Sequence, residues 1–137
     1  MRRETRARAR ALQALYAWDL RHEGNLSRVA EAMWDDLSVN PDERQMANAL
    51  VLDVEQHRDE LDREIANVTT NWRLDRLGAI ERSVLRMAAA ELHRGVTPAR
   101  VVIQEGIRLA ERYGSEQSAR FVNGVLDALA RRMGRLA

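Results

Sequence analysis

Apolar residues recur every three to four positions along almost the whole chain, and this helical period constrains the fold more than any other feature of the sequence. Only two of the 137 residues are prolines and seven are glycines, and most of them fall between the periodic segments. No stretch shows the alternation of a half-buried β-strand. The sequence therefore predicts an all-α protein, a single compact domain over residues 1–137, in which amphipathic helices bury their apolar faces against one another.

Helix-starting and helix-breaking residues divide this sequence into six predicted helices. The third starts at Asn40 and Pro41, because asparagine can cap a helix and proline suits its first turn. It should run to about residue 70, with a bend near residues 55–60. Gly95 and Gly114 end the fourth and fifth helices.

Charge is distributed unevenly along the chain. The formal net charge is +1, from 22 basic and 21 acidic residues, but the first ten residues carry five arginines against one glutamate. Arginine pairs with phosphate through two N–H groups and stacks on bases. The basic arm formed by the first ten residues is therefore compatible with RNA binding. The five arginines are Arg2, Arg3, Arg6, Arg8 and Arg10.

Several classes of function find no support in the sequence. Cysteine is absent, which removes disulfides and thiol chemistry, and the apolar runs are far shorter than the ~20 residues of a membrane span. His22, His57 and His93 are far apart in sequence, and no phosphate loop or nucleophile elbow is present. No apolar segment of a secretory signal follows the N-terminal arginines. We therefore expect a cytoplasmic protein without catalytic activity, cofactor or bound metal.

The aromatic residues and one glycine also carry expectations. Trp18, Trp34 and Trp72 should be core or half-buried anchors. Gly124 lies inside the last predicted helix, where glycine costs about 1 kcal/mol relative to alanine. We expect it to allow the close approach of a neighbouring segment.

Three short blocks, with helical sequence between them, resemble in order and spacing the NusB family of bacterial transcription antitermination factors. The resemblance covers essentially residues 2–130. The blocks are Ala11-Leu12-Gln13-Ala14-Leu15-Tyr16; Trp72-Arg73-Leu74-Asp75-Arg76-Leu77 with Glu81, Leu85-Arg86 and Glu91-Leu92; and Phe121-Val122-Asn123-Gly124-Val125-Leu126-Asp127.

The resemblance implies a fold of two packed three-helix bundles with an extra helix, about seven helices in all. It also implies a function in antitermination complexes on ribosomal RNA operons. In that family the protein pairs with the ribosomal protein NusE, and the pair binds the single-stranded boxA element of nascent RNA in the transcription elongation complex. The sequence leaves open whether the free protein is a monomer or a homodimer.

The resemblance also implies roles for particular residues. The five N-terminal arginines would contact phosphates, Gln13 would offer amide hydrogen bonds, and the rings of Tyr16 and Phe121 would stack on bases. Gln117 and Arg120 would complete the RNA surface. The family commonly has aspartate at the position of Gln117, and an amide can donate where a carboxylate only accepts, which affects the base read there. The partner-binding residues would be Glu81, Arg86, Glu91 and Glu105.

Other interpretations of the same residues remain open at this point. Tyr16 and Phe121 could be core residues, the arginines a solvated terminus, and the charges of the fourth helix intrahelical ion pairs. A separate alternative is a helical protein–protein adaptor that binds its partner through Glu81, Arg86 and Glu91 and does not bind nucleic acid. Two further alternatives are weaker. A domain appended to an RNA methyltransferase would need a cofactor domain that this chain, ending at Ala137, lacks, and a helix-turn-helix DNA-binding protein would need a basic recognition helix.

Overall fold

The computed structural model describes residues 2–21, 24–69 and 77–137, and all regular structure in these ranges is helical. None of the described helices is both long enough and apolar enough to cross a membrane. The predicted helix end at residue 70, the block from Trp72 to Arg76, and the anchor Trp72 itself lie outside the described residues. The helices are α1 (Arg3–Arg21), α2 (Leu26–Leu37), α3 (Pro41–Val68), α4 (Ala79–Arg94), α5 (Ala99–Tyr113) and α6 (Glu116–Arg132).

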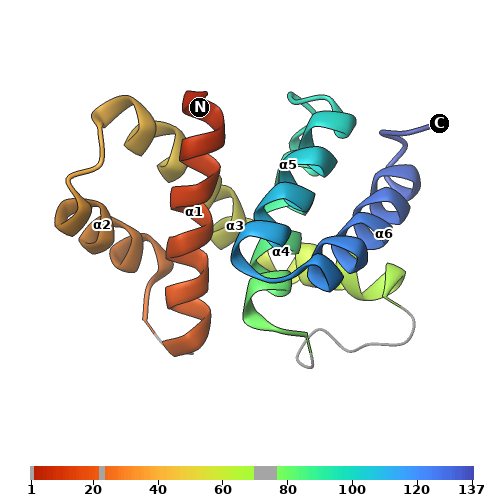
Figure 1. Cartoon of the computed structure of the whole chain (residues 1–137), viewed down its shortest axis with the longest axis horizontal. Coiled ribbons are helices and arrows are strands. Elements are labelled where there is room, and N and C mark those ends of the chain that lie inside the picture. Colours follow the sequence, from red (N-terminus) through yellow and green to blue (C-terminus); the bar gives the residue numbers. More distant parts are fainter. Residues whose placement is uncertain (1, 22–23, 70–76) are drawn as a thin grey trace.

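The helices form two bundles of three (Figure 1). Helices α1, α2 and α3 pack against one another, and so do α4, α5 and α6. Helix α4 also packs against α1 and α3, which joins the bundles. The predicted all-α class and the two packed bundles are therefore confirmed.

Helix α3 is kinked at His57, within the stretch where the sequence predicted a bend. The backbone of His57 has φ −120° and ψ 17°, outside the helical range. The segment before the kink contacts α2, where Glu55 accepts hydrogen bonds from Ser27. The segment after it pairs with α4 through Asp62 and Arg86. If these two segments are counted separately, the six described helices become the seven expected from the family.

The predicted helix boundaries rest on identifiable local contacts. The Asn40 side chain accepts a hydrogen bond from the backbone N–H of Asp42, and Pro41 occupies the first turn of α3. Gly95 ends α4 with φ 73°, a left-handed conformation that glycine adopts without steric cost.

Helix α4 lies at the centre of the core. Residues 83–92 are all buried, and the helix contacts α1, α3, α5 and α6. Trp34 is also fully buried, whereas Trp18 is partly buried, as expected for anchors. Because Arg86 and Glu91 lie within the buried stretch of α4, each needs an oppositely charged partner inside the protein.

The first such partner is Asp19 of α1. Its carboxylate accepts hydrogen bonds from Arg82 Nε at 3.0 Å, Arg82 Nη2 at 2.5 Å and Arg86 Nη1 at 3.0 Å. Arg86 also donates to Asp62 of α3 at 2.8 and 3.0 Å. Burial alone would raise the pKa of Asp19, but the hydrogen bonds and charges of Arg82 and Arg86 outweigh it and hold that pKa below its ordinary value.

The second set of buried charges connects the beginning of α1 to α4 and α5. Arg8 forms two hydrogen bonds of 2.8 Å to the carboxylate of Glu91 and one of 3.3 Å to Glu105. Thr5 donates a further hydrogen bond of 2.7 Å to Glu105. The hydrogen bond to Glu91 is the main cause of a raised pKa for Arg8 and outweighs the opposing effect of burial.

We predict that replacing Asp19 by asparagine lowers the free energy of unfolding by about 3–5 kcal/mol at neutral pH, because two guanidinium groups lose their shared carboxylate. The folded-state pKa of Asp19 is depressed, so its contribution is fully present above the ordinary carboxyl pKa of about 4 and is lost as the pH falls through the lower folded-state value. Chemical denaturation of both proteins across this pH range measures the effect.

Asp127 provides the matched control for this prediction. Its ion pair with Arg131 is an exposed pair within α6, so Asp127→Asn should change the stability by at most a few tenths of a kcal/mol. A stability difference between Asp19→Asn and the unsubstituted protein that does not shrink in acid would contradict the assigned role of Asp19.

Candidate RNA-binding surface

One face of α1 is accessible to solvent and carries four of the ten predicted RNA-binding residues. Positions 2, 6, 9, 13, 16 and 20 are spaced alternately by four and three residues, which places them on one side of the helix. Arg2, Arg6, Tyr16 and Leu20 are exposed there, and Gln13 is partly exposed. Tyr16 retains 36% of its accessible surface. We call these six positions the outer row of α1.

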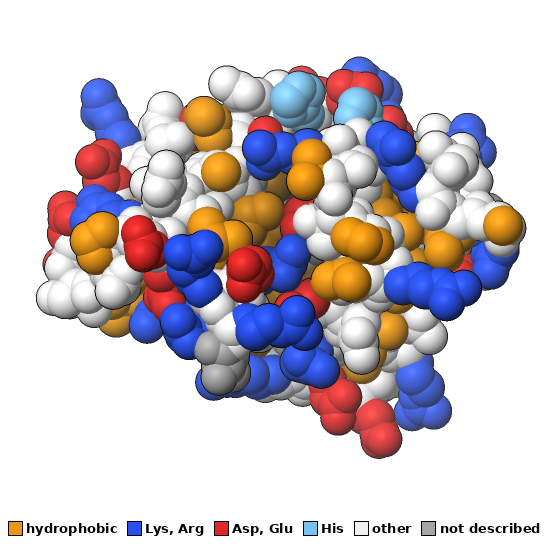
Figure 2. Space-filling model, turned by 90° about the horizontal axis from the view of Figure 1, so that it is seen from above, with side chains coloured by type: hydrophobic (Ala, Val, Ile, Leu, Met, Phe, Trp, Pro, Cys, Tyr) orange, Lys and Arg blue, Asp and Glu red, His pale blue; other side chains and the backbone are white. Residues whose placement is uncertain are grey.

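Acidic residues in the first turn of α3 bind three of the arginines near the beginning of α1. Glu43 accepts hydrogen bonds from Arg6 Nε at 2.9 Å and Arg10 Nε at 3.1 Å, and Asp42 lies 3.7 Å from Arg3. The arginine side chains nevertheless keep between a third and a half of their accessible surface. Figure 2 views the molecule from the end where α1 begins and shows basic side chains grouped with acidic ones between them. The cations are thus oriented and still reachable from solvent.

The first turns of α6 supply the second part of the surface. Gln117 and Arg120 are exposed, and Phe121 is partly buried with one side against the core. An open hollow of about 390 Å³ lies between these turns and the beginning of α4. Ser118 is held at its edge by a hydrogen bond of 2.5 Å to Glu81. The hollow is lined by Leu77, Gly78, Glu81, Ser115, Gln117, Ser118 and Phe121.

Two adjacent residues of α4 connect these two parts. Arg82 binds Asp19 of α1, while Glu81 binds Ser118 of α6. Tyr16 precedes Asp19 by one helical turn, and Phe121 follows Ser118 by one turn. The beginning of α4 thus contacts both helices that carry the predicted aromatic residues, and a single RNA surface that includes Tyr16 and Phe121 stays a prediction.

The prediction for Arg8 requires correction. Arg8 lies on a different side of α1, about 100° around the helix from the outer row, together with Thr5, Leu12, Leu15 and Asp19, all of which are buried. Only 7% of Arg8 is accessible, and its guanidinium is bound to two carboxylates. It joins helices and does not face a phosphate.

Three of the four predicted partner-binding residues also require correction. Arg86, Glu91 and Glu105 are buried and form ion pairs within the chain. In this conformation they hold helices together and offer no surface to a partner. Glu81 differs, because it is partly exposed and borders the hollow beside Gln117.

The expectation for Gly124 is also wrong. A Cβ atom added at this position would meet no other atom within 4 Å, and the residue is exposed. The glycine therefore leaves an open patch on α6 one turn beyond Phe121. Sequence reasoning missed the roles of Glu43, Asp19 and Arg82. Polar residues recurring in the otherwise apolar row of α1 could have indicated the buried pairs.

The chemistry of this surface suits an extended polyanion with exposed bases. Guanidinium groups can meet phosphates, an aromatic ring offers a stacking platform, and the amide of Gln117 can both donate and accept hydrogen bonds at a base edge. The described side chains that could hold a metal ion lie elsewhere, on α3 and α4.

Comparison with known proteins places the chain in a family. The model of the NusB family matches residues 5–131. The transcription antitermination protein NusB of Anaeromyxobacter dehalogenans is 50% identical over 131 residues, which cover 93% of this chain and 90% of that protein.

Two solved structures share the fold. NusB of T. maritima has a TM-score of 0.86 and 30% identity, with 99% of each chain covered. A crystal structure of the antitermination factors NusB and NusE in complex with double-stranded RNA matches with a TM-score of 0.86 and 34% identity, covering 96% of this chain and 98% of that one. Because sequence and structure agree over nearly the whole length, the chain belongs to the NusB family.

Proposed function

We propose that this protein is an RNA-binding transcription antitermination factor that binds the boxA element of nascent ribosomal RNA together with the ribosomal protein NusE. The observation that carries the proposal is the outer row of α1, where Arg2, Arg6, Gln13 and Tyr16 share one accessible face. The antitermination role of its relatives and the solved complex of NusB, NusE and RNA support it.

Electrostatic attraction would supply most of the affinity. Arg2, Arg3, Arg6 and Arg10 lie beside one another along the first turns of α1, and each can release a counterion from a phosphate. Glu43 keeps Arg6 and Arg10 close together before RNA arrives, which reduces the side-chain entropy lost on binding.

Base recognition would fall to the aromatic residues and the hollow. Tyr16 presents an accessible ring for stacking, and Phe121 forms a wall of the hollow. A base inserted there would find the Gln117 amide and the Glu81 carboxylate within the same lining. A single-stranded element fits this arrangement, because only unpaired bases expose both faces and edges.

The proposal includes no catalytic step, and it places the protein in the cytoplasm, where bacterial transcription occurs. We further propose that residues 1–137 act as one domain within the elongation complex. The alternative of an adaptor that never binds RNA is not favoured, because two of the three residues on which it depended, Arg86 and Glu91, are buried in internal ion pairs. Glu81 remains the candidate for contact with NusE.

We predict that the double variant Arg6→Gln, Arg10→Gln binds boxA RNA more weakly and with less dependence on salt. Each phosphate contact to a single strand contributes about 0.7 to the slope of log K against log salt concentration, so two lost contacts should reduce that slope by about 1.4. Glutamine retains an N–H donor for Glu43, which preserves the fold. Filter binding with NusE at several salt concentrations measures the slope.

Arg132→Gln is the control for the salt measurement. Arg132 is exposed at the end of α6, roughly 22 Å along that helix from Gln117, so its removal should leave the slope unchanged. Equal slopes for the double variant and the unsubstituted protein would contradict phosphate contact by Arg6 and Arg10.

We also predict that Tyr16→Leu weakens RNA binding by about 1–3 kcal/mol, the contribution of one stacked base. The residue is exposed, so the fold should tolerate the change, whereas Tyr16→Phe keeps the ring and should bind almost normally. Fluorescence anisotropy with labelled boxA RNA compares the three proteins. If the Tyr16→Leu and Tyr16→Phe variants bind RNA equally well, Tyr16 does not stack on a base.

A further inference from the structure

Three side chains from two helices bring metal-ligating atoms together on another part of the surface. Glu60 and Glu64 lie one turn apart on α3, after the kink, and His93 lies in the last turn of α4. His93 Nε2 is 3.3 Å from Glu60 Oε1 and 3.8 Å from Glu64 Oε1. All three ligating atoms lie within 4.8 Å of one another.

These separations are close to those around a tetrahedral metal ion. Ligand atoms bound to zinc at about 2.0–2.1 Å lie about 3.3 Å apart, so small side-chain rotations would bring all three into its coordination sphere. Two carboxylates balance the charge of a divalent cation. The imidazole nitrogen favours zinc and similar transition metals over magnesium, which prefers oxygen ligands.

Glu64 provides a second, independent observation. The Glu64 side chain keeps 27% of its surface accessible, but its Oε2 atom is buried and has no hydrogen-bond partner among the described residues. Leaving a charged oxygen in this state is costly. A cation bound to the Glu64 carboxylate would offset that cost. The ion pair with His93 does not, because it involves the other carboxylate oxygen, Oε1.

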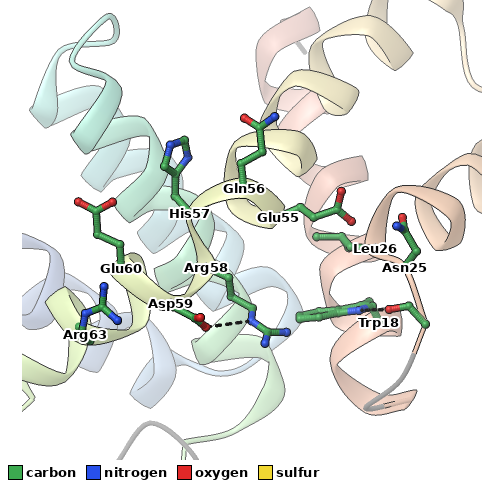
Figure 3. Close-up of a pocket in the computed structure, with 11 residues that line it drawn as sticks. Trp18, Asn25, Leu26, Glu55, Gln56, His57, Arg58, Asp59, Glu60 and Arg63 are labelled. Carbon is green, nitrogen blue, oxygen red and sulfur yellow. Dashed lines mark hydrogen bonds and ion pairs between the residues drawn. The ribbon is translucent and has the colours of Figure 1, made fainter.

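The kink of α3 lies beside the group without contributing a ligand to it. His57, at the kink, stacks against the His93 ring with 6.3 Å between ring centroids, and its Nδ1 lies 3.0 Å from the carbonyl oxygen of Asp53. Figure 3 shows His57 and Glu60 projecting to one side of α3, whereas Arg58 projects towards Trp18 of α1. The nearby Arg94 binds Asp53, so its charge is already engaged.

We propose that Glu60, Glu64 and His93 form a binding site for a divalent transition-metal ion such as Zn²⁺, which joins the second segment of α3 to the end of α4. The sequence predicted no metal site, because these ligands come from separate helices and match no spacing motif. The metal site lies on α3 and α4, whereas the proposed RNA surface lies on α1 and the first turns of α6, so the two sites share no residue.

Isothermal titration calorimetry of the tag-free full chain with ZnCl₂, after treatment with a chelator, tests the proposal. We expect one equivalent of zinc to bind and MgCl₂ to give no binding. Glu64→Gln and His93→Gln should each weaken zinc binding at least about tenfold. Zinc should also raise the midpoint of thermal unfolding of the unsubstituted protein and leave that of His93→Gln unchanged.

His57→Gln is the matched control, because it removes a neighbouring imidazole that is not among the three ligands. It should retain the zinc affinity of the unsubstituted protein. Circular dichroism and RNA binding of the variants verify that they fold. The proposal is overturned if no saturable zinc binding is seen, if Glu64→Gln and His93→Gln bind zinc normally, or if His57→Gln loses as much affinity as they do.

Discussion

The structure depends on the pairing of buried charges along α4. This helix is enclosed by the rest of the protein over residues 83–92, yet it carries Arg86 and Glu91 in that stretch. The buried charges are stabilised because α1 provides an oppositely charged residue beside each of them. Asp19 pairs with Arg82 and Arg86, and Arg8 pairs with Glu91. Since removing one member of a buried pair is far more costly than losing a surface pair, these contacts fix the axial position of α1 on α4.

Fixing α1 in this way gives its two sides different tasks. The inner side carries the paired residues and small apolar side chains, which leaves the outer row free for a ligand. Arg6 and Arg8 are only two positions apart, but one retains about half of its side-chain accessibility and the other about a tenth. Through Arg82 and Glu81 the beginning of α4 contacts both α1 and α6, so the relative placement of the two parts of the proposed RNA surface follows from how the two bundles are joined.

Much of this fold could be predicted from the sequence, because helix period, caps and the bend at His57 are local properties. Which charged side chains are buried and which are exposed could not be predicted. Whether Arg8 faces phosphate or core is decided by Glu91 and Glu105, which lie 83 and 97 residues further along the chain. For the same reason the sequence did not show that those glutamates are buried, while the row of Arg2 and Arg6 followed from spacing and the roles of Gln13 and Tyr16 came from the family resemblance. Two features could not be predicted from a sequence motif, because each is formed by residues of separate helices. They are the hollow beside Phe121 and the Glu60–Glu64–His93 group.

The central claim is that one RNA surface spans the outer row of α1 and the first turns of α6. Ultraviolet crosslinking of the protein, with NusE, to boxA RNA, followed by mass spectrometry of the crosslinked peptides, tests it most directly. We expect crosslinks at Tyr16 and Phe121 and none at Trp34, which is buried in the core. Crosslinks that avoid both Tyr16 and Phe121, and map to another face of the molecule, would contradict it.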